Sequence, residues 1–222
     1  MQTPDLDPLE IKMISARNFY RNLGLTIGSL WLISVGGAFA AWSLIAVRSV
    51  LAYSLLVFLG IAAGTLLTTG VRLIVSSRRL LRGVAADAVQ RRRLSFRFGL
   101  VVAAEVVACN VVSMMCLRAH RWELIVPLTL IVVGLHFLPL ARLFHVPRYN
   151  VTGVLFCLIP AATLVAFSPA AHLGHALSWV AIPEIGCGLA ALITGAAGLD
   201  EVQQFLNRST VSMGWRSATR SA

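Results

Sequence analysis

Charged side chains are scarce in this chain, and most of those present carry one sign. Only 13% of the 222 residues are charged, whereas about a quarter are charged in soluble domains. Hydrophobic residues make up 58% of the chain, and the mean hydropathy is +0.81. This composition excludes an ordinary soluble domain and indicates a protein that lies in lipid.

Lysine is almost missing, so the net charge of +10 comes from arginine. A basic balance can indicate nucleic-acid binding, but these arginines flank apolar blocks and form no long stripe interleaved with aromatic residues. We therefore expect anionic lipid at the cytoplasmic face, and not nucleic acid, to be the partner of the positive charge.

Motifs for covalent, nucleotide or metal chemistry are missing as well. The four cysteines all lie inside apolar stretches, which excludes a disulfide framework or a zinc knuckle: Cys109, Cys116, Cys157 and Cys187. No nucleotide-binding loop, nucleophile elbow or zinc-protease helix motif occurs. An enzyme is therefore the less favoured class, and we expect no cofactor.

Long apolar runs are what the chain has in abundance. A membrane-spanning helix needs about 20 apolar residues. Six blocks qualify, at residues 23–47, 50–75, 98–117, 124–144, 151–167 and 176–197. The sequence predicts an all-α polytopic transmembrane bundle, residues 1–222 forming a single membrane domain.

The placement of the basic residues predicts the orientation, because basic loops stay in the cytoplasm. With six spans and the N-terminus inside, 16 of the 19 basic residues fall on inner segments. The segment 76–97 is expected to be a basic cytoplasmic loop that lies against lipid. Its arginines are Arg78, Arg79, Arg82, Arg91, Arg92, Arg93 and Arg97.

The segment before the first span carries helix-start signals. Asp7 suits an N-cap, Pro8 the first helical position, and Glu10 the position three after the cap. We expect an amphipathic helix from about Pro8 that lies along the inner headgroups before the chain turns into the bilayer. The acidic start is unlike a cleaved signal peptide, so the first span is expected to be retained as a signal anchor.

Four polar residues lie inside predicted spans: Glu105 and Asn110 in the third, His136 in the fourth and Glu184 in the sixth. A charge at mid-span costs about 2.5–3.5 kcal/mol on insertion scales, so such residues usually face the bundle interior. We expect one shared polar centre that exchanges protons near neutral pH. The alternative is a hydrogen-bonded cluster that only fixes helix packing.

A second polar set lies on the predicted outer face: His120, Glu123, His172 and His175. Three histidines and a carboxylate are a reasonable set of zinc ligands, and histidines three apart can share a helical face. The alternative is a group of interfacial histidines without a ligand. We expect no bound metal under ordinary conditions.

The segment 134–144, GLHFLPLARLF, with Tyr149 and Gly153 after it, carries a resemblance to a known family. It resembles small bacterial multi-pass membrane proteins, known only as a domain of unknown function, that have a Gly-x-His-Phe-x-Pro segment in a late span. The resemblance implies about six helices and a bacterial inner membrane, and it points to His136. It implies no activity.

Three functions remain open. The first is transport of a small solute or proton, which a polar cavity joining Glu105, His136 and Glu184 would favour. The second is a metal-dependent membrane enzyme, which convergence of the outer histidines and Glu123 would favour. The third is a non-catalytic membrane subunit, which gains if neither set converges.

The uneven distribution of arginine leads to a test of topology. Reporter fusions placed after Arg93 and after Ala222 should both report a cytoplasmic location, because the basic segments are held inside. A periplasmic signal at either fusion point would break the six-span arrangement.

Overall fold

The structure is a computed structural model that describes the backbone of residues 8–80 and 88–218 and the side chains of residues 25–72, 75 and 96–204. The six arginines from Arg78 to Arg93 fall outside the described side chains. The helices themselves take up much of the predicted basic loop, because α2 continues to Leu80 and α3 begins at Ala88.

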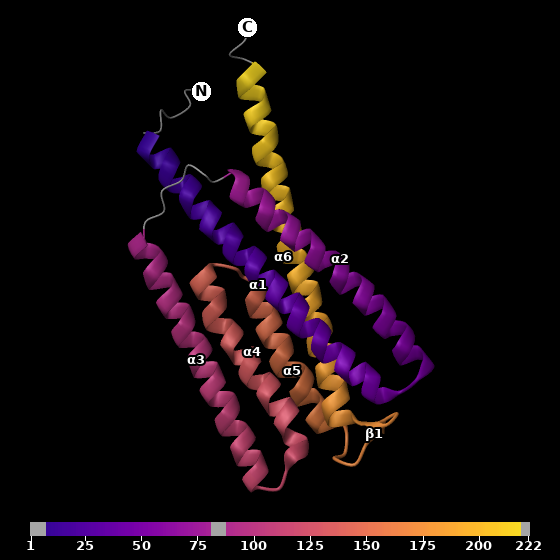
Figure 1. Cartoon of the computed structure of the whole chain (residues 1–222). Coiled ribbons are helices and arrows are strands. Elements are labelled where there is room, and N and C mark those ends of the chain that lie inside the picture. Colours follow the sequence, from indigo (N-terminus) through magenta and orange to yellow (C-terminus); the bar gives the residue numbers. More distant parts are fainter. Residues whose placement is uncertain (1–7, 81–87, 219–222) are drawn as a thin grey trace.

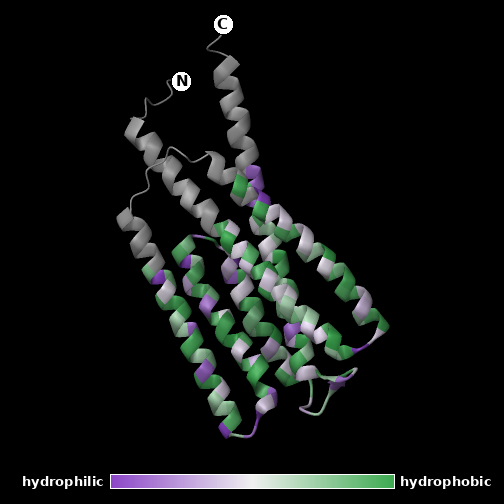
Figure 2. Cartoon of the chain, viewed as in Figure 1, coloured by the Kyte–Doolittle hydropathy of each residue, from purple (hydrophilic) through white to green (hydrophobic). Residues whose placement is uncertain are grey.

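Six long helices make up the described fold: α1 Pro8–Val47, α2 Val50–Leu80, α3 Ala88–Arg118, α4 Ile125–Phe144, α5 Arg148–Ala166 and α6 Ser178–Ala218. Each contains a stretch of 19–27 residues that is long and apolar enough to cross a bilayer. Hydrophobic residues run along the whole described length of the helices (Figure 2). The predicted all-α, multi-pass membrane bundle is confirmed.

The helices run up and down, so that the start of α1 and the end of α6 lie at the same end of the bundle (Figure 1). At the opposite end, a 3-10 turn, η1 Trp122–Leu124, joins α3 to α4. A two-stranded hairpin, β1 His172–Leu173 and β2 Ala176–Leu177, joins α5 to α6. Each connection is short, and neighbouring spans therefore run in opposite directions.

The first helix begins at Pro8, as its capping signals predict, but it then differs from the expectation. It continues without a break to Val47, over 40 residues. At a rise of 1.5 Å per residue this is about 60 Å, twice the thickness of the hydrocarbon core. The expected turn between an interfacial helix and the first span is therefore not formed, because nothing between them interrupts the helical hydrogen bonds.

Two hydrophobic clusters form the core, and both contain α1 and α6. One cluster adds α4 and α5, and the other adds α2. Of the α3 residues from Phe96 onward, whose side chains are described, the half-buried Val101 is the one that packs against them. The first and last spans are therefore the centre of the bundle, and α3 is its outermost part.

Small residues let the backbones of α1 and α6 come into contact. A Cβ added to Gly36 would lie 2.7 Å from the carbonyl oxygen of Gly188, and one added to Gly188 would lie 2.6 Å from that of Gly36. Gly195 is equally close to α1, since its Cβ would lie 2.9 Å from the Ser29 carbonyl oxygen. Close approach at small residues is a main source of helix association in lipid.

This contact predicts a large stability loss for Gly188→Leu. The new side chain would have to displace backbone atoms of α1, and we expect a cost of about 3 kcal/mol, the upper end for overpacking. Thermal unfolding of the purified protein in detergent measures it. The matched control is Gly64→Leu on α2, where an added Cβ meets nothing within 4 Å. Equal unfolding temperatures for the two variants would contradict the α1–α6 contact.

Candidate functional site

The third and fourth spans bring a carboxylate and a histidine together inside the membrane. His136 Nδ1 on α4 lies 3.2 Å from Glu105 Oε2 on α3. The side chains are 8% and 14% exposed, respectively, so the pair is shielded from its surroundings. The contact has the distance of an ion pair but not the direction of a hydrogen bond, and Nδ1 has no other partner among the described residues.

Helix geometry places this pair deep in the bilayer. Glu105 lies 13 residues before the end of α3, and His136 lies 11 residues after the start of α4. At 1.5 Å per residue, these positions are about 20 Å and about 17 Å from the turn that joins the two helices. Both groups therefore sit near the middle of the hydrocarbon core, where an unpaired charge is most costly.

The segment around His136 explains why its ring faces α3. Gly134 packs against α5, where an added Cβ would meet the Gly153 carbonyl oxygen at 2.8 Å. The Phe137 ring contacts those of Tyr149 and Phe156, with centroids 5.9 and 5.5 Å apart. α5 thus holds one face of α4, and His136, about 100° from Phe137 around the helix, is left facing α3.

Apolar contacts accompany the ionisable pair where α3 meets α4. The rings of Phe98 and Phe144 meet edge to face, with centroids 5.9 Å apart. Cys116 is buried near the opposite end of α3. The Glu105–His136 pair therefore lies along α3 between the Phe98–Phe144 contact and the buried Cys116, and it is a polar part of the α3–α4 interface.

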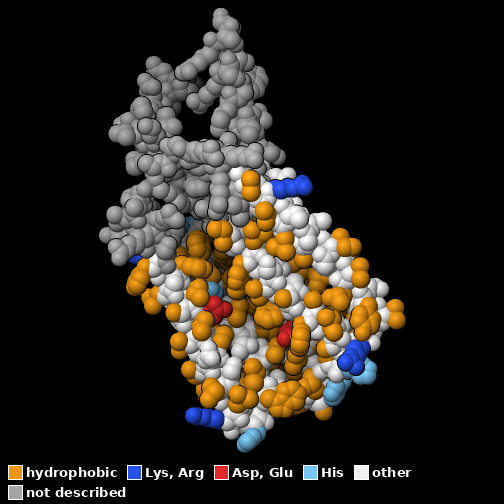
Figure 3. Space-filling model, viewed as in Figure 1, with side chains coloured by type: hydrophobic (Ala, Val, Ile, Leu, Met, Phe, Trp, Pro, Cys, Tyr) orange, Lys and Arg blue, Asp and Glu red, His pale blue; other side chains and the backbone are white. Residues whose placement is uncertain are grey.

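Glu184 has a different partner. It is buried on α6 and accepts a hydrogen bond from Ser43 Oγ on α1. It lies six residues after the start of α6, about 9 Å into the helix, and is therefore shallower than Glu105 and His136. Figure 3 shows acidic side chains at two separate places on an otherwise hydrophobic face.

Asn110 faces away from the pair. Its side chain is exposed, and Nδ2 donates to the Val106 carbonyl oxygen of its own helix at 2.7 Å. The structure thus divides the four predicted residues of the polar centre. Glu105 and His136 are together, Glu184 is bonded to α1, and Asn110 is turned outward.

The outer residues are not gathered into a metal-binding group. Within the described part of the chain, no three His, Cys, Asp or Glu side chains lie close enough to hold a metal ion. Glu123 pairs with Arg121, and the Nδ1 atom of His172 lies 2.7 Å from the Ala170 carbonyl oxygen.

The expected helical face of His172 and His175 is not formed. Gly174 between them has φ +62°, and the two residues Gly174 and His175 make the tight turn of the hairpin. Glycine is favoured at such a position because it takes positive φ without strain. An added Cβ there would also lie 2.3 Å from the Val47 carbonyl oxygen.

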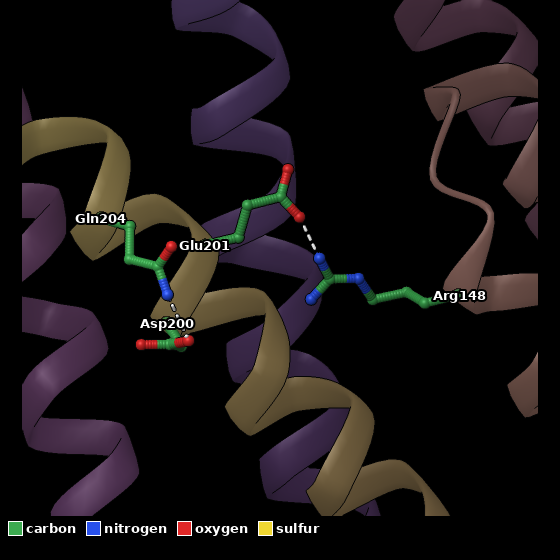
Figure 4. A network of polar contacts seen from close by, with 4 residues as sticks. All are labelled: Arg148, Asp200, Glu201 and Gln204. Atoms are coloured by element: carbon green, nitrogen blue, oxygen red, sulfur yellow. Dashed lines mark hydrogen bonds and ion pairs between the residues drawn. The ribbon is translucent and has the colours of Figure 1, made fainter. Parts of the chain in front are cut away.

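A further ionic contact was not anticipated from the sequence. Arg148 at the start of α5 donates from Nη2 to Glu201 on α6, beside a hydrogen bond from Gln204 to Asp200 (Figure 4). One turn further along α5, Thr152 Oγ1 lies 2.7 Å from Thr194 Oγ1. The sequence is weak evidence for this ion pair, because charged residues such as Arg148, Asp200 and Glu201 commonly occur at the ends of membrane spans without a partner.

Comparisons with protein-family models, with curated proteins and with solved structures find no match. The fold and the site alone therefore give its class. It is an integral multi-pass membrane protein with a histidine–carboxylate pair within its spans.

The pair predicts different stability effects for two substitutions of Glu105. Glu105→Leu leaves the buried His136 Nδ1 with an apolar side chain in place of its ion-pair partner and should cost about 1–3 kcal/mol. Glu105→Gln keeps the shape and a hydrogen-bonding group, and it should change stability little. Thermal unfolding in detergent compares them, and the pair would lose its structural role if the leucine variant were as stable as the wild type.

Proposed function

We propose that this is a bacterial inner-membrane protein, with both termini in the cytoplasm, in which the Glu105–His136 pair exchanges protons during transport of a small solute or of the proton itself. The observation that carries the proposal is the 3.2 Å contact between these two groups at mid-membrane. Ionisable residues at that depth mark ion or substrate pathways in membrane proteins more often than elsewhere.

The chemistry of the pair favours a proton carrier. One proton shared between an imidazole and a carboxylate leaves the pair with no net charge, whichever of the two atoms holds it. Movement of the proton between Nδ1 and Oε2 therefore changes no net charge in the low-dielectric interior, where an isolated charge would be costly. Release of this proton leaves one negative charge on the pair until another proton is taken up, so transport requires that water reaches the pair from each side in turn to stabilise that state.

The distribution of basic residues supports the proposed orientation. By the predicted topology, Arg48, Arg118 and Arg121 are the basic residues of the outer segments, and the other 16 fall on inner segments. The resemblance at residues 134–144 supports a bacterial inner membrane. Anionic lipid headgroups at the cytoplasmic face are the proposed partners of the basic segment, and nucleic acid has no part in the proposal.

A non-catalytic membrane subunit is the second candidate, and the position of Glu184 favours it. Transport through one polar centre would be better supported if Glu184 joined the pair, whereas Glu184 is bonded to Ser43 and so links α6 to α1. A groove of about 300 Å³ between α1 and α2 has an apolar lining that includes Gly37, Ala63 and Leu67. It is not a polar path.

Proton flux into liposomes separates the two candidates. Purified protein is placed in vesicles that contain a pH-sensitive dye, and a potassium gradient with valinomycin supplies the driving potential. The wild type should acidify the lumen faster than empty vesicles do, and Glu105→Gln should lower that rate by about a hundredfold, since glutamine cannot carry the proton.

The matched control is Glu184→Gln, because it changes another buried carboxyl group within a span without touching the pair. Its flux should stay near that of the wild type. A wild-type rate equal to that of empty vesicles, or an equal loss in both variants, would sink the proton-carrier proposal and favour the subunit.

A further inference from the structure

α3 has one packed face and one open face. It is the least buried of the six spans, with 6% of its most apolar stretch buried against 44% for α6. The face opposite α4 carries a stripe of exposed residues at helical spacing of three and four, which we call the α3 outer stripe. It consists of Gly99, Ala103, Val106, Asn110, Met114 and Leu117.

Asn110 is an unusual residue for a lipid-facing position. The span Phe96–Arg118 has its midpoint three residues away, so the amide lies near the centre of the bilayer. Only Nδ2 has a partner, the Val106 carbonyl oxygen, and Oδ1 accepts no hydrogen bond from any described residue. Hydrocarbon offers no donor, so an acceptor left this way costs about 1–3 kcal/mol.

The amide cannot be satisfied by the proton-exchanging pair. Asn110 is five residues from Glu105, which is about 140° around the helix. Glu105 points to α4, and Asn110 therefore points away from the bundle. With no partner among the described side chains, lipid or another protein chain is left to meet it.

Gly99 and Ala103 on the same stripe permit a second helix to come close. They have the four-residue spacing of small residues that lets two helix backbones approach in membranes. A Cβ added to Gly99 meets nothing within 4 Å, whereas the close-packed Gly36 and Gly188 are each occupied by a neighbouring helix. The stripe thus combines an open site for backbone contact with an unsatisfied amide.

We propose that the α3 outer stripe is the interface with a second copy of this chain. A primary amide contains both a donor and an acceptor, so two Asn110 side chains related by a two-fold axis can each donate to the other's Oδ1. The contact is self-complementary and needs no other polar residue. A buried asparagine in an apolar helix seam also fixes the register of the two helices.

Cysteine cross-linking tests the geometry of this interface. In the full-length protein in its membrane, Ala103→Cys should give a disulfide-linked dimer on mild oxidation. Ala104→Cys is the matched control, since it is the same substitution at an adjacent exposed residue that lies about 100° away from the stripe. The wild type under the same oxidant reports any cross-link of the native cysteines. No cross-link at Ala103, or equal yields at the two positions, would overturn the proposal.

The role of the amide is tested by energy transfer between labelled copies in bilayers diluted with lipid. Asn110→Leu should weaken dimerisation about tenfold, the effect expected from loss of interhelical amide hydrogen bonds. Thr65→Val on α2 is the control, because it removes an exposed polar group that bonds only to its own helix, and it should leave the dimer unchanged. An unchanged dimer in Asn110→Leu, a monomer in the wild type, or a cross-link from Ala103→Cys to a different protein would each refute a self-interface.

Discussion

The approach of the α1 and α6 backbones at Gly36 and Gly188 is the contact on which the other helix positions depend. Between helices in lipid there is little hydrophobic driving force, so close packing and polar contacts must hold them together. The glycines bring Ser43 within hydrogen-bonding distance of Glu184. α6 in turn binds α5 through Thr152 and Thr194, and α5 holds α4 at Gly153. The orientation of His136 is therefore the last step of a chain of contacts that begins at two glycines.

The membrane fold was predictable because the cost of burial in lipid depends on composition over about 20 residues, which the sequence states directly. Two details of the backbone were not. The turn expected between the helix at Pro8 and the first span is missing, since amphipathic pattern alone does not interrupt a helix. The histidines at 172 and 175 were expected on a helical face, but Gly174 between them forms a hairpin turn.

The candidate site was predictable in residue type and only partly in arrangement. Depth and charge single out Glu105, His136 and Glu184, but they do not say which helices are neighbours. Helical spacing alone would have separated Asn110 from Glu105, because five residues place them on different faces. The partner of Glu184 could not be predicted from the sequence, since Ser43 is one small hydroxyl in an apolar run and lies 141 residues away in the chain.

That separation also constrains how the protein is assembled. Chains are synthesised at about 5–20 residues per second, so α1 enters the bilayer on the order of ten seconds before the residues of α6 that pack against it exist. During this interval its glycine face has only lipid, the spans inserted after it or the insertion machinery beside it. The bundle can close only after the sixth span has been inserted, and folding of the central core is therefore a late, post-insertion event. If translation stops before α6 is made, the membrane holds five spans, and the glycine face of α1 lacks its partner helix.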